Sequence, residues 1–150
     1  MTKDVIVSIA GTHIDTFGEA IYLEDESLAI TAPGSYFQKD GKHYLFYEEF
    51  SEDLSAVTKN RIRINNENSV EIMKTGYFNA TLSFEKGVLT KSYYDTPVGK
   101  LLLGIKTHHL KVEISPQFIL LEIDYELDLD NEPYADCKII MEVKPKLVEA

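Results

Sequence analysis

Residues 119–129 alternate between apolar and acidic side chains, and this pattern is the strongest in the chain. The apolar positions are Ile119, Leu121, Ile123, Tyr125, Leu127 and Leu129, and the acidic positions are Glu122, Asp124, Glu126 and Asp128. Successive side chains of a β-strand point to opposite faces, so a period of two predicts a strand with one buried and one solvated face. A helix would instead scatter the four carboxylates around its circumference.

Most of the remaining chain reads in the same way, as alternating segments separated by turn signals. Asp40 and Gly41 are typical of a two-residue hairpin turn, and residues 65–68, 86–87 and 130–133 mark further turns. Only residues 19–30 or 51–56 have a composition that suits a short helix. The expected strands are 5–14, 35–39, 42–50, 57–64, 70–75, 80–85, 88–94, 101–108, 118–129 and 135–143.

Strands of this kind, joined by short connections without βαβ spacing, predict an antiparallel meander. A twisted sheet of many strands tends to curl and close, which removes its exposed edges. We therefore expect an all-β fold in which residues 1–150 form one domain, a single antiparallel up-and-down barrel of about 8–10 strands. A sandwich of two sheets is the alternative.

Composition and charge restrict the partners of such a domain. The 150 residues suffice for one hydrophobic core, and 44% hydrophobic with 27% charged residues is typical of soluble proteins. The formal net charge of −10 repels phosphate backbones and anionic lipid surfaces, so we expect neither a nucleic-acid nor a membrane partner. No apolar stretch approaches the roughly 18 residues of a membrane span.

The cysteine content bears on the compartment. Cys137 is the single cysteine, which excludes an internal disulfide and suits a reducing environment. It lies in register with Ile139 and Met141, so we expect a buried thiol rather than a nucleophile. The apolar run at residues 5–10 is too short for the core of a signal peptide. We expect a cytoplasmic protein.

A series of short motifs continues through the middle and end of the chain. They are LFYEE at 45–49, RIRI at 61–64, VEIMKTG at 70–76, LSFEKG at 82–87, YDTPVG at 94–99, IKT at 105–107 and IDYEL at 123–127. The series resembles the YwiB-like family of small, uncharacterised bacterial β-barrel proteins and spans most of the chain. One departure is Lys74, where the resemblance leads us to expect arginine; lysine keeps the charge and loses the bidentate fork.

The resemblance implies a calycin barrel, the lipocalin-like shape of small carrier proteins. It implies no catalytic residues, because the family has no established activity. The fold thereby gains support, and function gains only an analogy.

Candidate ligand-binding residues come as polar pairs spaced two apart, so that each pair shares one face of its strand. If those faces point inward, they place charges, phenols and hydroxyls inside the barrel, as in small barrels that hold a ligand. If they point outward, they form a ladder of charge pairs; a buried salt bridge that plugs one end is a third reading. Tyr125 of the segment 119–129 offers a further phenol. The candidates are therefore Tyr47, Glu49, Arg61, Arg63, Tyr94, Thr96 and Tyr125.

Metal and catalytic chemistry find little support. The acidic row of 119–129 would bind a divalent cation only if it faced inward. That would expose the apolar row, at a cost of about 25 cal/mol for each Å². His108 and His109 are adjacent, so in a strand they would point to opposite faces and could not chelate one ion. No GxSxG, P-loop, GxGxxG or CxxC pattern occurs. We therefore expect no catalytic residues, metal site or cofactor.

Two segments, residues 43–50 and 101–103, are apolar on both faces. A barrel wall has one dry side, so something must cover the other. The candidates are the segment 19–34, a short helix at 51–56, or a second subunit in a homodimer.

Three functions remain open on the sequence. The first is a cytoplasmic barrel that binds a small apolar molecule or lipid in its interior. The second is a non-enzymatic interaction protein or homodimeric structural barrel, which the doubly apolar strands favour. The third is a metal-dependent enzyme on phosphorylated substrates, which would need the acidic strand to face inward.

Overall fold

A computed structural model describes residues 4–15, 30–50, 57–76, 79–96 and 99–146, with the side chains of 11–15, 30 and 96 excluded. These residues form strands and turns, and no described helix is long and apolar enough to cross a membrane. The strands are β1 (Asp4–Asp15), β2 (Ile30–Lys39), β3 (Lys42–Phe50), β4 (Val57–Asn66), β5 (Ser69–Gly76), β6 (Asn79–Glu85), β7 (Leu89–Thr96), β8 (Gly99–Ile114), β9 (Ile119–Leu129) and β10 (Glu132–Pro145).

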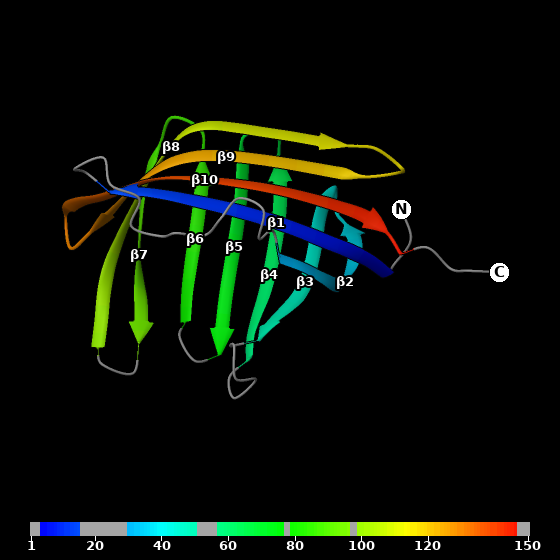
Figure 1. Ribbon diagram of the computed structural model, residues 1–150. Helices are drawn as coiled ribbons and strands as arrows, with labels where there is room; N and C mark the ends of the chain where they lie inside the picture. The colour runs from blue at the N-terminus through cyan, green and yellow to red at the C-terminus, as the bar shows by residue number, and fades with distance from the viewer. Residues whose placement is uncertain (1–3, 16–29, 51–56, 77–78, 97–98, 147–150) are drawn as a thin grey trace.

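The strands form one closed antiparallel barrel in which every sequence neighbour is also a neighbour in the sheet. β1 closes the ring, because it pairs with β10 on one side and with β2 on the other. In Figure 1, β1, β8, β9 and β10 cross β4, β5 and β6 at a steep angle, so the barrel has two facing walls. The expected all-β, up-and-down, calycin-like barrel is confirmed, and the sandwich alternative is wrong.

The barrel interior is packed with large apolar side chains. β9 has the two faces that its pattern predicts. The side chains of Ile119, Leu121 and Ile123 are fully buried, whereas Glu126 is exposed. Tyr125 continues the buried row and packs edge-on against Phe84, with ring centroids 4.9 Å apart. The apolar row therefore faces the core and the acidic row faces outward.

Two strands differ from the sequence expectation. β2 begins at Ile30 and passes through Pro33 and Gly34, whereas the expected strand begins at residue 35. Proline is tolerated there because that half of β2 pairs only with β1, so the strand has one free side. β8 runs to Ile114 because a β-bulge between Thr107 and His109 resets its register on β9. The possible helices at 19–30 and 51–56 lie almost wholly outside the described residues.

We predict that replacing an apolar residue of β9 will destabilise the protein much more than replacing an acidic one. Leu121→Ala should lower the free energy of unfolding by about 2–5 kcal/mol, since it leaves a cavity in the packed core. Asp124→Ala, three residues away on the outer face, should change it by less than about 0.5 kcal/mol. Urea denaturation followed by circular dichroism measures both, and equal losses would contradict the assignment of the two faces.

Candidate functional site

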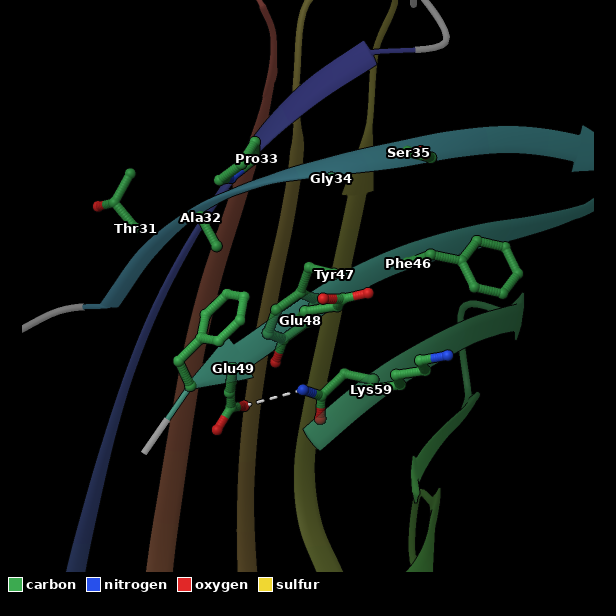
Figure 2. A pocket seen from close by; sticks show the side chains of 12 residues that line it. Thr31, Ala32, Pro33, Gly34, Ser35, Phe46, Tyr47, Glu48, Glu49 and Lys59 are labelled. Atoms are coloured by element: carbon green, nitrogen blue, oxygen red, sulfur yellow. Dashed lines mark hydrogen bonds between the residues drawn. The ribbon is translucent and has the colours of Figure 1, made fainter. Parts of the chain in front are cut away.

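A pocket lies where the pairing of β2 with β3 ends. Their ladder runs from Lys39–Lys42 to Gly34–Tyr47 and ends there. Beyond that point β2 continues along β1, while β3 continues along β4 to Phe50. The space between the two strand ends is a pocket of about 770 Å³. Figure 2 shows it with β2 on one side and β3 on the other.

Gly34 stands at the apex of this opening. A Cβ atom built on Gly34 would lie 2.6 Å from the backbone oxygen of Phe46 and 3.2 Å from Val7. No larger residue fits without pushing β2 away from β3, because the closest contact is backbone rather than a flexible side chain. The glycine therefore holds the two strands together at the last point where they pair.

A cluster of polar side chains forms the inward face beside the opening. Tyr47, Asn60 and Lys74 are successive cross-strand partners on β3, β4 and β5, and Glu49 follows Tyr47 on the same face of β3. Asn60 Nδ2 donates to Glu49 Oε1 at 3.1 Å, and Lys74 Nζ donates to Asn60 Oδ1 at 2.8 Å. Lys74 Nζ also lies 3.3 Å from Glu49 Oε1. We call Glu49, Asn60 and Lys74 the polar cluster.

The polar cluster is largely buried although two of its members are charged. Asn60 is 2% exposed, and the side chains of Lys74 and Glu49 keep 22% and 28% of their surface exposed. A charge withdrawn this far from water requires a partner, and each charged member supplies one for the other. The two formal charges cancel, so the cluster as a whole is neutral.

Tyr47 links the cluster to the core. Burial raises the pKa of its phenol, and the negative charge of Glu49 together with a hydrogen bond between the two side chains raises it further. The phenol is thus held in its neutral form, as a hydrogen-bond donor to Glu49. The cluster offers a ligand both donors and acceptors, because an ammonium has three N–H groups and a carboxylate two oxygens.

The predicted candidates divide between the two sides of the wall. Tyr47 and Glu49 face inward and line the pocket. Arg61 and Arg63 project outward from β4, where both bind Glu71 of β5, at 3.3 and 3.0 Å respectively. The structure therefore does not bring the arginines to Tyr47 and Glu49.

The other candidates lie deeper or further round the barrel. Tyr94 occupies an inward position on β7 opposite Ala80 and Leu101, and burial raises its pKa. Thr96 ends β7 opposite Gly99, and its side chain lies outside the described residues. Tyr125 on β9 is 6% exposed, and burial raises its pKa.

Tyr125 is hydrogen-bonded to Cys137, its cross-strand partner on β10. Burial raises the pKa of Cys137 to about 11; the hydrogen bond from Tyr125 acts in the opposite direction, and the charge of Asp136 raises the pKa as well. The thiol thus stays protonated at neutral pH and lacks the thiolate character of a nucleophile. This agrees with the expectation of a buried, structural cysteine.

Asn60 and Lys74 of the polar cluster were not predicted as site residues from the sequence. Asn60 precedes Ile62 and Ile64 in the inward register of β4, and Lys74 follows Val70 and Ile72 in that of β5. A polar residue in phase with a buried apolar row was the available signal. Lys74 attracted notice only as a departure from the family pattern.

The two adjacent histidines lie differently from the sequence expectation. The β-bulge of β8 places His108 and His109 both on the outer face, where each meets a carboxylate of β9. His108 Nε2 lies 3.2 Å from Glu126, and His109 Nε2 lies 3.9 Å from Glu122. The prediction that they point to opposite faces is wrong. Among the described residues no three His, Cys, Asp or Glu side chains are grouped as metal ligands.

We predict that the polar cluster contributes to stability through its charge pair. Lys74→Met keeps the length of the side chain but leaves Glu49 without its cation, and should lower the free energy of unfolding by about 1–3 kcal/mol. The matched control is Lys111→Met, which breaks an ion pair with Glu113 of 3.2 Å on the exposed wall. Because that pair is solvated, its loss should cost less than about 1 kcal/mol. Chemical denaturation compares them; indistinguishable losses would count against a buried pair.

Comparisons with known proteins place this geometry in a family. A crystal structure of the ywiB protein from Bacillus subtilis superposes with a TM-score of 0.81, at 17% identity, covering 97% of this chain and 93% of that one. At that identity the likeness shows the fold alone. No curated protein sequence matches the chain. The family model described as "domain of unknown function (DUF1934)" matches residues 9–141. The chain therefore belongs to the DUF1934 family, whose function is not established.

Proposed function

We propose that this barrel binds a small amphiphilic molecule, such as a lipid with a compact polar end, at the opening between β2 and β3. The observation that carries the proposal is that Tyr47, Glu49 and Asn60 line an open pocket of about 770 Å³, with Lys74 paired to Glu49 beside it. Ligand sites of small barrels combine apolar walls with a few convergent polar groups, and this opening has both.

The apolar part of such a ligand has a surface to lie against. Ala32 and Pro33 contribute from β2, and Tyr47 and Phe50 contribute from β3. Phe50 keeps 59% of its surface exposed, so a bound ligand would remove a large aromatic face from water. The barrel centre is filled by side chains such as Leu45, Ile62 and Phe84, so the ligand is proposed to enter the opening rather than thread the interior.

The polar end of the ligand follows from the charge balance of the cluster. Because Glu49 and Lys74 neutralise each other, a ligand with a strong net charge would have to displace one of them. A hydroxyl, amide or zwitterionic group would instead donate to Glu49, which lines the pocket, without breaking the pair. We therefore favour a neutral or zwitterionic polar end.

The other functions stand differently. The enzyme hypothesis needs the acidic row of β9 to line the interior, and that row faces outward, so its premise is not met. The composition and the single cysteine support the cytoplasm as the proposed location. The interaction hypothesis depends on the outer face of the same wall.

Native mass spectrometry of protein purified without detergent, before and after delipidation, tests the proposal first. We expect a co-purifying small molecule that delipidation removes. Titration with the neutral fluorophore N-phenyl-1-naphthylamine, and displacement of it by a monoacylglycerol, should then show saturable binding to the delipidated protein.

Matched variants assign that binding to the opening. Phe50→Ala should weaken fluorophore binding by about five- to tenfold, because it removes one apolar wall. Tyr93→Ala, which removes an aromatic ring exposed to 63% on β7, should leave it unchanged. The neutral pair Glu49→Gln with Lys74→Gln should weaken the monoacylglycerol more than the fluorophore. Absence of both a co-purifying molecule and probe binding would overturn the proposal.

A further inference from the structure

The outer side of the β2–β5 wall carries a second set of side chains that ligand binding at the opening does not use. Cross-strand pairing arranges them in two rows. Phe37, Tyr44, Arg63 and Glu71 are successive partners in one row, and Ser35, Phe46, Arg61 and Met73 in the next. We call Phe37, Tyr44, Phe46, Arg61, Arg63 and Glu71 the basic aromatic face.

The aromatic part of this face is preassembled. The rings of Phe37 and Tyr44 stack with centroids 4.7 Å apart and an angle of 10°, and those of Phe37 and Phe46 with 5.6 Å and 15°. Phe37 remains 42% exposed and Phe46 36% exposed. Tyr44 and Phe46 belong to the outer side of the doubly apolar segment 43–50, and Phe37 lies beside them on β2.

Arg61 and Arg63, beside the rings, are bound to one carboxylate but do not use all of their hydrogen-bond donors. Both donate through Nη2 to the carboxylate of Glu71, which the two guanidinium groups share. Within the described part of the chain, the Nε atoms of Arg61 and Arg63 are buried without a hydrogen-bond partner. One carboxylate against two guanidinium groups leaves a positive charge on this face.

The surrounding wall strengthens this local charge. The outward positions of β2 to β5 add Lys39, Lys42 and Lys59 to the two arginines, against the carboxylates Glu48 and Glu71. The chain as a whole carries a formal charge of −10, and the opposite wall presents the acidic row of β9. The basic aromatic face is thus a cationic region on an acidic protein.

We propose that the basic aromatic face docks an acidic polypeptide segment of another protein, one that presents apolar side chains next to carboxylates. Charge complementarity supplies the first reason, since guanidinium groups bind carboxylates and each of the two already contacts Glu71 through Nη2. The exposed aromatic surface of Phe37 and Phe46 supplies the second, because aromatic residues and arginine are enriched at protein interfaces.

A polypeptide fits this face better than a nucleic acid. Base stacking needs free ring faces, and the stacked arrangement already turns at least one face of each of Phe37, Tyr44 and Phe46 toward another ring. The phosphate backbone of a nucleic acid would also extend beyond the cationic region, where the overall charge of −10 repels it. A short segment with a few carboxylates avoids most of that repulsion.

Fluorescence anisotropy of the whole protein with labelled peptides tests the proposal. The probe is a peptide with glutamate, leucine and glycine in repeating order; a peptide with lysine for glutamate and an oligothymidylate of equal length are comparisons. We expect saturable binding of the acidic peptide alone, weakened by added salt. Arg61→Gln with Arg63→Gln should reduce that affinity by at least about tenfold.

Two further variants guard against a trivial loss. Lys138→Gln with Lys144→Gln removes the same number of charges from the outer wall of β10 and should change affinity by less than about twofold. Glu71→Gln should strengthen binding, because it frees both guanidinium groups for the peptide. The proposal is overturned by no peptide binding, by equal loss in the two double variants, or by tighter binding of oligothymidylate. Self-association that Arg61→Gln with Arg63→Gln abolishes would assign the face to a second copy instead and also overturn it.

Discussion

The pairing of β1 with both β10 and β2 is the constraint on which the rest of the structure depends. It removes the two free edges that an open sheet of this length would expose, and it fixes which side of every strand faces inward. It also acts on β2, whose first half must lie along β1 while its second half lies along β3. Only Gly34 and Ser35 pair on both sides. The opening between β2 and β3 follows from this change of partner, and Gly34 permits the close approach at its apex.

Closure also sorts the charged residues of this wall into two environments. Inside, Glu49 and Lys74 are tolerated because they pair with each other and with Asn60. Outside, Arg61 and Arg63 share Glu71 next to a stack of aromatic rings. The same strands therefore present a neutral polar cluster to the barrel and a cationic, aromatic surface to solvent. Two different kinds of partner suit the two sides, which is why a ligand and a docking segment are proposed separately.

Much of the fold can be predicted from a period of two along the chain. The alternation in 119–129 assigns both faces of β9, and the turn at Asp40 and Gly41 assigns a hairpin. The faces of β4 are equally readable, since Arg61 and Arg63 alternate with the buried Ile62 and Ile64. β3 is ambiguous because both of its faces are apolar, so its pattern alone could not assign Tyr47 and Glu49 to the inside.

Other features depend on contacts between distant segments and leave no local trace. The bulge in β8 arises from its register against β9, and it places His108 and His109 together outside. The opening at β2 depends on β1, which is remote from β3 in sequence. The polar cluster joins Glu49, Asn60 and Lys74 from three strands, so no spacing within one segment could reveal it.

The location of bound ligand is the property that tests the proposed function most directly. Amide chemical shifts of the isotope-labelled, delipidated protein can be followed by NMR during titration with a monoacylglycerol. Binding at the opening predicts the largest changes at Ala32, Gly34, Glu49 and Asn60, with little change at the far end of β3 near His43. Changes concentrated near His43, or no saturable change at all, would contradict a ligand site between β2 and β3.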